Sequence, residues 1–130
     1  MAGRRPGTGA ALPVHCTSAG KLYLASLPEA TLDRRLRLAE FSAHTERTIT
    51  SPAALREELA HVRRRGFAVS DQELAKGIRT VGAPVRDARG TVIGSINATM
   101  LVSAVGVRDL RTRVVPALMG AAARLSALSA

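Results

Sequence analysis

The most constraining feature of the sequence is a pair of strand-like runs separated by a short turn. Residues 78 to 85 (IRTVGAPV) and 91 to 100 (TVIGSINATM) are rich in residues that favour strands, and RDARG connects them. Asp87 and Gly90 stand at positions typical of a tight turn. The two runs therefore predict an antiparallel β-hairpin. A third strand-like run, GFAVS at 66 to 70, precedes them.

The second strand of this hairpin is expected to have two different faces, because successive side chains point to opposite sides of a strand. One set of alternate positions is apolar or small: Val92, Gly94, Ile96, Ala98 and Met100. The other set is mostly polar: Thr91, Ile93, Ser95, Asn97 and Thr99. We expect the first face to pack against a helix. The second face has two interpretations, a surface in contact with water or one wall of a site for a small organic acid.

Three helices are predicted before the strand region, at residues 17 to 26, 28 to 38 and 52 to 65. The third has the clearest signals, because Ser51 and Pro52 are typical of an N-cap and a first helical position, and Gly66 of a left-handed cap. The segment FSAHTERTIT has no helical period and is interpreted as a connector.

A last helix is predicted at residues 107 to 128, where it is expected to cover the apolar face of the sheet. Its predicted buried face consists of Leu110, Val114, Leu118, Ala121 and Leu125. Pro116 lies inside this segment. Because proline lacks an N–H, it predicts a kink or a new first turn at that point.

The formal charge of +9 suggests a nucleic-acid partner, since phosphate binding depends on lysine and arginine. The basic residues are however spread along the whole chain, and aromatic residues amount to only 2%, too few for a base-stacking surface. The arginine triplet at 63 to 65 falls in the last turn of a predicted helix, where positive charge complements the helix dipole. A small basic nucleic-acid-binding protein remains the alternative hypothesis.

Cysteine, histidine and hydropathy patterns exclude several further classes. Cys16 is the only cysteine, so the chain has no intrachain disulfide, and a cytoplasmic location is expected. His15, beside it, is expected to point away, and His44 and His61 are interpreted as isolated; no metal site or cofactor is predicted. No run of about 18 apolar residues predicts a membrane span.

The segment TSAGK at 17 to 21 is a candidate anion site. It lacks the first glycine and the final hydroxyl residue of a phosphate-binding loop, so that motif is excluded. A helix that begins with small residues nevertheless offers free N–H groups that an anion can approach closely. Simple helix capping is the alternative, and no set of nucleophile, base and orienting group can be assembled for an enzyme.

Three parts of the chain, in this order, resemble the effector-binding domain of IclR-type transcriptional regulators. They are LPVHCTSAGKLYLASLPE, HTERTITSPAALREELAHVRRRGFAVSDQELAKGIRTVGAPVRDARGTVIGSINATM and VVPALMGAAARLS. The similarity runs from about Leu12 to Ser126 and is strongest to the branch that senses aromatic acids and their ring-cleavage products.

This resemblance implies an α+β fold of the GAF-like (profilin-like) type, in which a curved antiparallel sheet with helices packed on it binds a small carboxylate. It also implies that the chain is a ligand sensor and not an enzyme. The ligand-binding positions that carry over are Ser18, Ala19, Gly20, Ser70, Thr80, Asn97 and Thr99.

The same resemblance carries expectations about organisation and partners. Residues 1–12 are expected to be a disordered head, and residues 13–130 an effector-binding domain that is incomplete on its N-terminal side. DNA would be contacted only through a winged helix-turn-helix domain that is absent from this chain, and the sensor domain is expected to form homo-oligomers. A non-functional fragment of a regulator is a further alternative.

Overall fold

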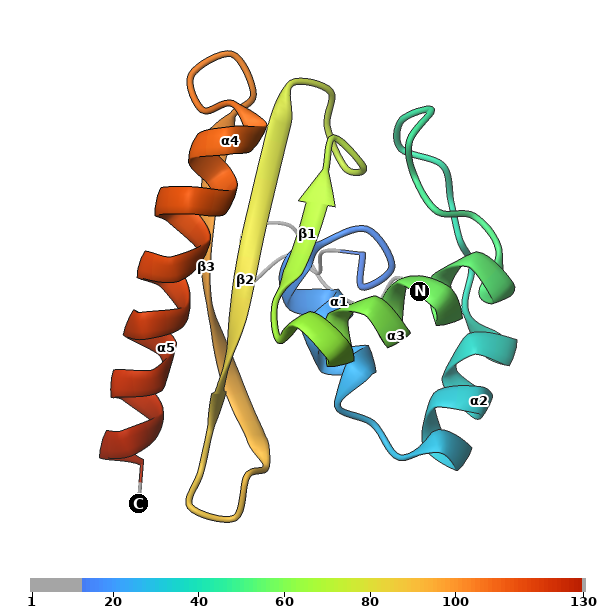
Figure 1. Cartoon of the computed structure of the whole chain (residues 1–130). Helices are drawn as coiled ribbons and strands as arrows, with labels where there is room; N and C mark the ends of the chain where they lie inside the picture. Colours follow the sequence, from blue (N-terminus) through green and yellow to red (C-terminus); the bar gives the residue numbers. More distant parts are fainter. Residues whose placement is uncertain (1–12, 130) are drawn as a thin grey trace, which may run out of the picture.

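The computed structural model describes residues 13–129, so the disordered head predicted for residues 1–12 lies outside the described part. Helices and strands follow one another along the chain as shown in Figure 1. Their bounds are α1 Ser18–Ala25, α2 Glu29–Leu38, α3 Pro52–Arg65, β1 Ala68–Asp71, β2 Ile78–Arg86, β3 Val92–Leu101, α4 Val107–Asp109, a π-helical turn Leu110–Val114, and α5 Val115–Leu128. The predicted helices and strands are therefore confirmed, with shifts of a few residues at their ends.

The three strands form one antiparallel sheet in the order β1-β2-β3. Helix α5 lies along one face, where its apolar side chains pack against β2 and β3. Helix α1 contacts the sheet from the opposite face and also contacts α3 (Figure 1). Because helices are packed on an antiparallel sheet, the predicted α+β class is confirmed.

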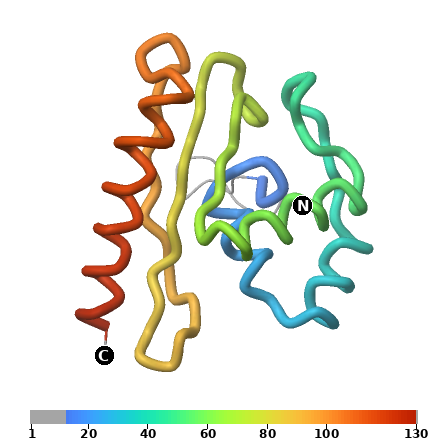
Figure 2. The backbone as a smooth tube through the Cα atoms, viewed as in Figure 1, coloured from blue at the N-terminus to red at the C-terminus, as the bar shows by residue number. Residues whose placement is uncertain are grey.

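A second apolar cluster lies away from the sheet and joins the three N-terminal helices. It consists of Leu24 from α1, Leu32 and Leu36 from α2, and Leu55 and Leu59 from α3. The connector between α2 and α3, seen as a long loop in Figure 2, packs the partly buried Phe41 and Ile49 against this cluster. Burial of these leucines fixes α1 in place, and α1 supplies one wall of the site described below.

Helix α3 has the predicted ends. The Ser51 hydroxyl accepts a hydrogen bond from the Ala54 N–H, and Gly66 adopts φ +83°, the left-handed conformation that favours glycine. The arginine triplet occupies its last turn. Interpretation of the triplet as a helix end is therefore confirmed.

One prediction about the faces of β3 is wrong at its first residue. A β-bulge between Val85 and Arg86 pairs Arg86 with Val92, so that Ile93 is an extra residue in the ladder. The bulge turns Val92 away from α5, and Val92 borders a cavity together with Leu22 of α1. The remaining apolar positions of β3, Ile96, Ala98 and Met100, pack against the α5 cluster as predicted.

The predicted buried face of the last helix is right at Leu110 and Leu118 and wrong at its other positions. In the π-helical turn the Val115 N–H donates to the carbonyl of Leu110, five residues earlier, and not to the carbonyl four residues earlier as in an α-helix. This turn therefore contains one extra residue, which changes the side chains that face the sheet. The buried residues are consequently Leu110, Val115, Leu118 and Ala122. Leu125 is exposed, whereas Pro116 stands in the first turn of α5, as one of the two predicted alternatives requires.

In the described residues 13–129, no helix combines the length and the apolar character needed to cross a membrane.

Candidate functional site

The first turn of α1 provides backbone N–H groups without helical acceptors. The Thr17 hydroxyl caps the helix, since it accepts from the Gly20 N–H at 3.1 Å and donates to the Pro13 carbonyl at 2.8 Å. The first helical bond runs from the Lys21 N–H to the Thr17 carbonyl. The N–H groups of Ser18 and Ala19 precede this bond and are therefore available to an anion.

The polar faces of β2 and β3 lie opposite this turn. The Ser18 hydroxyl donates to Asn97 Oδ1 at 2.8 Å, so α1 and β3 are joined directly. Asn97 Nδ2 donates in turn to the Ser95 hydroxyl at 2.8 Å. On the neighbouring pair of strand positions, the hydroxyls of Thr80 and Thr99 are 3.2 Å apart. Three segments distant in sequence thus form one polar wall.

Gly82 leaves the space that the Asn97 side chain occupies in this wall. It is paired with Asn97 across the two strands, and a Cβ atom at position 82 would stand 2.2 Å from Asn97 Oδ1. It would also stand 3.0 Å from a methyl group of Leu22. The missing side chain therefore lets the amide of Asn97 lie over β2 and reach Ser18. The sequence analysis did not single out this glycine.

A cavity of about 330 Å³ lies between these elements. Its lining residues are Cys16, Thr17, Ser18, Ala19, Ser70, Leu74, Ala75, Ile78, Thr80, Asn97 and Thr99. Six of the seven positions expected from the resemblance are among them, and Gly20 is not. The structure therefore brings together Ser18, Ala19, Ser70, Thr80, Asn97 and Thr99.

Gly20 and Ser70 have structural contacts that compete with a role in binding. A Cβ atom at Gly20 would stand 2.3 Å from the Val14 carbonyl, so the glycine permits close packing of the preceding segment, and its N–H is already used by Thr17. The Ser70 hydroxyl borders the cavity but donates its hydrogen to the Cys16 carbonyl at 2.5 Å. Its oxygen can still accept one hydrogen bond.

The sequence analysis missed the apolar end of the cavity. Leu74, Ala75 and Ile78 come from the loop after β1 and from the start of β2. Loop residues carry no periodic signal, which is why these contacts were not predicted. Gln72 begins the loop with a left-handed φ of 58°, and Gly77 ends it with φ +83°. Between these two residues, the loop places Leu74 and Ala75 in the lining of the cavity.

A buried ionic cluster lies beneath the cavity and was also missed. The side chain of Lys21 is fully buried, and its ammonium donates at 2.8 Å to Glu58, Glu73 and the Val69 carbonyl. All three N–H donors of the lysine are satisfied. The cluster joins α1, α3 and β1, while Glu73 Oε1 is buried and has no hydrogen-bond partner among residues 13–129.

A partly exposed pair lies at the end of β1. Burial alone would raise the pKa of Asp71, but hydrogen bonds from Arg79 and Gln72, together with the charges of Arg79 and Arg47, outweigh it and lower the pKa below its usual value. Arg79 Nε donates to Asp71 Oδ1 at 3.1 Å, and Arg79 Nη1 donates at 3.3 Å to the Val105 carbonyl in the loop after β3.

The prediction that His44 is isolated is wrong, and so is the expectation that His15 points away from Cys16. His15 and His44 lie beside Cys16, and one potential ligand atom from each of the three residues lies within 4.8 Å of the others. Cys16 is fully buried. Burial raises the pKa of its thiol to about 11, with a further contribution from the charge of Glu73 that the charge of Lys21 partly offsets.

A second cavity, of about 350 Å³, lies at the other end of the sheet. It is bordered by α1, α3 and the turn of the hairpin, and the side chains of Arg63 and Arg86 line it. Both arginines are engaged with backbone carbonyls, Arg63 with that of Ala25 and Arg86 with that of Gly90. A substitution in this second cavity can therefore serve as a control for substitutions in the first.

The fold and the cavity together define the class of protein. Helices pack on both faces of an antiparallel sheet, and the cavity between the sheet and a helix N-terminus has one polar and one apolar end. Small-molecule sites of soluble domains have this character. The structure is thus an α+β domain with a small-molecule cavity.

The profile of the family described as bacterial transcriptional regulator IclR C-terminal matches residues 4–127. The chain therefore belongs to this family and corresponds to the effector-binding domain of IclR-type regulators. The prediction of a regulator domain that is not an enzyme is confirmed by this membership.

Curated relatives match over part of their length. The chain is 36% identical over 113 residues to the Pca regulon regulatory protein of Pseudomonas putida, which covers 87% of this chain and 39% of the relative. It is 39% identical over 79 residues to the transcriptional repressor IclR of Escherichia coli K12, covering 61% of this chain and 29% of the relative. The chain thus spans well under half the length of these relatives.

Solved structures give the same fold. The inducer-binding domain of the PobR transcription factor from Acinetobacter, as a double mutant in complex with 3-hydroxybenzoic acid, has a TM-score of 0.86 at 29% identity, covering 91% of this chain and 67% of that one. The C-terminal domain of Escherichia coli KdgR has a TM-score of 0.81 at 31% identity, covering 88% of this chain and 70% of that one. The expected GAF-like arrangement is confirmed.

Proposed function

We propose that this domain senses a small organic acid, bound in the cavity between the first turn of α1 and the polar faces of β2 and β3. The observation that carries the proposal is that the first turn of α1, at Ser18 and Ala19, lines the same cavity as Asn97 and Thr99. A carboxylate would accept hydrogen bonds from the two N–H groups, assisted by the positive end of the helix dipole.

The shape of the cavity favours an acid with an apolar body. Its polar end is formed by α1 and the strand hydroxyls, whereas Leu74, Ala75 and Ile78 supply apolar surface from the loop side. An aromatic ring against this apolar surface would leave its carboxylate at the polar end. We therefore propose an aromatic acid or a related ring-cleavage product as the effector.

The relatives support this choice of ligand class. The Pca regulon regulatory protein is among the similar proteins, and the PobR domain of similar fold was solved with 3-hydroxybenzoic acid. By analogy with full-length regulators of this family, effector binding would control transcription in the cytoplasm, with DNA contacted through a winged helix-turn-helix domain outside this chain.

The first experiment is a thermal-shift screen of benzoate, hydroxybenzoates and keto acids, followed by calorimetric titration of the best ligand. Two variants test the site. Ala19→Pro removes one N–H donor at a first-turn position where proline is tolerated, and Asn97→Leu removes the amide at similar size. Each charge-assisted hydrogen bond is worth about 1.5–3 kcal/mol, so each variant should weaken binding about tenfold or more.

The matched control is Thr91→Val, which lies in the second cavity. It should bind the acid as tightly as the parent protein. Equal affinity of the parent, Ala19→Pro and Asn97→Leu, with all three folded by circular dichroism, would contradict the proposed site.

We also propose that the domain associates with a second copy through β3. In the described part of the chain, β3 has a strand neighbour only on its β2 side, and it carries the exposed apolar residues Ile93 and Leu101. An unpaired strand edge of this kind can pair with another strand. Light scattering should detect a dimer or larger species that Ile93→Lys reduces, and a monodisperse monomer at high concentration would contradict the proposal.

A further inference from the structure

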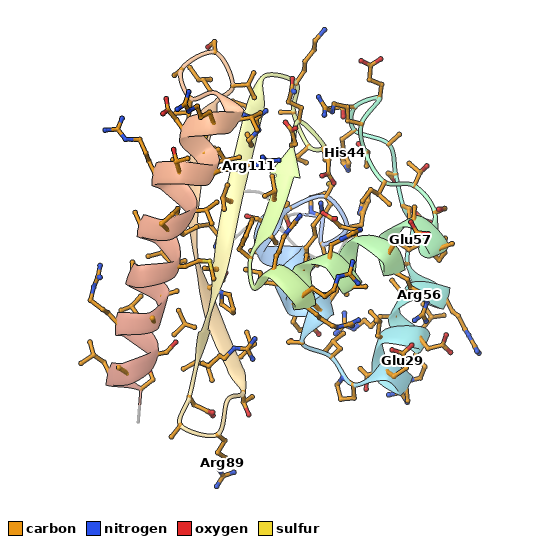
Figure 3. The ribbon with its side chains drawn as sticks, in the orientation of Figure 1. Glu29, His44, Arg56, Glu57, Arg89 and Arg111 are labelled. Carbon is orange, nitrogen blue, oxygen red and sulfur yellow. The ribbon has the colours of Figure 1, made fainter. Side chains whose placement is uncertain are left out.

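A cluster of three side chains beside the effector cavity has no part in the function proposed above. His15, Cys16 and His44 each offer a ligand atom, and these atoms lie within 4.8 Å of one another. His15 and Cys16 precede α1, whereas His44 belongs to the connector between α2 and α3. Figure 3 shows His44 on this connector, close to the loop that follows β1. The cluster is therefore made by the fold and not by adjacency in sequence alone.

A hydrogen bond to the backbone holds the His15 side chain in place. The buried His15 ring has its Nε2 atom 2.9 Å from the Ser42 carbonyl, which can only accept a hydrogen bond. Nε2 therefore carries the proton, and Nδ1 keeps its lone pair for a cation. A backbone carbonyl that orients a histidine in this way is a common feature of metal sites.

Side-chain hydrogen bonds hold the connector in place near His44. The Thr48 hydroxyl accepts from the His44 N–H at 3.0 Å and donates to the Glu73 carbonyl at 2.6 Å. Thr45 donates to the Gln72 carbonyl at 2.6 Å. The backbone of His44 is thus held against the loop after β1, while its side chain is exposed and free to turn.

We propose that His15, Cys16 and His44 bind a divalent cation of the zinc type. One thiolate and two imidazoles are the ligands that zinc and cobalt prefer, whereas calcium and magnesium require oxygen ligands. Three protein ligands leave one position of a tetrahedral site for water or another small ligand. Binding forms the bond from the Cys16 sulfur to the metal and releases the thiol proton to solvent.

The distances fit after a small movement. In a tetrahedral site with bonds of about 2.0–2.3 Å, ligand atoms stand about 3.5 Å apart. Because the ligand atoms of the cluster lie within 4.8 Å of one another, the required closure is at most about 1.3 Å, estimated from that tetrahedral geometry. Rotation of the exposed His44 side chain can supply it.

The cation site shares Cys16 with the effector cavity. The two sites are nevertheless tested separately, because the metal experiment uses no organic acid. Failure of metal binding would leave the proposed effector site untouched, and failure of acid binding would leave the metal site untouched.

The experiment treats the full chain with a chelator and then titrates it with cobalt(II). Bound cobalt should produce a sulfur-to-cobalt charge-transfer absorption in the near ultraviolet, and zinc should displace it. His44→Gln is the main variant, since this exposed side chain can be replaced without disturbing the core. Loss of an outer partner already weakens metal binding about 10- to 100-fold, so loss of this direct ligand should weaken it at least about tenfold.

Two further variants complete the test. Cys16→Ser should abolish the charge-transfer absorption, and circular dichroism establishes that the variant is folded. His61→Ala is the matched control, because His61 lies on α3 against Arg64, apart from the cluster. It should bind cobalt like the parent. The inference is overturned if the parent shows no charge-transfer absorption, or if His44→Gln binds cobalt as tightly as His61→Ala.

Discussion

Replacement of Lys21 by methionine should destabilise the domain strongly. The ammonium of Lys21 is fully buried and is the common partner of Glu58 and Glu73, each at 2.8 Å. Without it, the Glu73 carboxylate, with a side chain only 10% exposed, loses its ion-pair partner. Glu58 retains a longer contact of 3.6 Å with Arg65. Breaking a buried ion pair by removing one partner costs about 3–5 kcal/mol.

The assay is urea unfolding at neutral pH, followed by circular dichroism. With a denaturant slope of about 1–2 kcal/mol per molar, the loss should lower the midpoint by roughly 1.5 M or more. The matched control is Arg56→Met, which removes a partly exposed cation from its ion pairs with Glu29 and Asp33; Figure 3 shows Arg56 beside Glu29. An exposed pair of this kind contributes about 0–1 kcal/mol.

A double variant tests whether the unpaired charge of Glu73 causes the loss of stability in Lys21→Met. Lys21→Met with Glu73→Gln removes the carboxylate that the single variant leaves unpaired, and it should recover about 1 kcal/mol or more of the loss. If Lys21→Met costs no more than Arg56→Met, or if Glu73→Gln recovers nothing, the buried cluster does not stabilise the domain in the way inferred here.

Further predictions concern three other positions. Gly82→Ala should cost about 1–3 kcal/mol of stability by overpacking against Asn97, measured by urea unfolding, and it should weaken acid binding in the same titration. Because the pKa of Asp71 is lowered in the folded state, its ion pair with Arg79 stabilises the domain at neutral pH and loses this effect as the pH falls below the ordinary value of 3.8. Asp71→Asn should therefore lower the melting temperature more at pH 7 than near pH 3, and an equal loss at both would contradict this. Cys16, buried and with a pKa raised to about 11, should react with iodoacetamide far more slowly in the native protein than in urea, and faster as the pH rises; rapid native alkylation at pH 7 would contradict its burial.

Local signals in the sequence were sufficient for most of the architecture. The Ser51 and Gly66 caps define α3, and the turn at Asp87 defines the hairpin, because each depends on residues close together in the chain. The errors arose where one extra residue shifts a period. The π-helical turn before Val115 shifts which residues of the last helix are buried, and the bulge at Ile93 turns the preceding Val92 to the other face of the sheet. Neither has a distinctive residue pattern.

The site was predicted only in part, because the sequence shows local patterns and not the contacts between distant segments. The resemblance supplied Ser18, Asn97 and Thr99, and alternation along β3 placed two of them on one face. Contacts between distant segments carried no such signal. The burial of Lys21 between two glutamates and the approach of His44 to Cys16 depend on how the connector and the loop after β1 fold back on α1.

The most direct test of the central claim is an amide NMR titration of the isotope-labelled chain with 3-hydroxybenzoate. The account predicts that the largest shift changes occur at the backbone amides of Ser18 and Ala19 and around Thr80, Asn97 and Thr99, because these residues line the proposed cavity. Residues of the second cavity, such as Arg63 and Val92, should change little. Saturable shifts centred on the second cavity, with Ser18 and Ala19 unaffected, would contradict it.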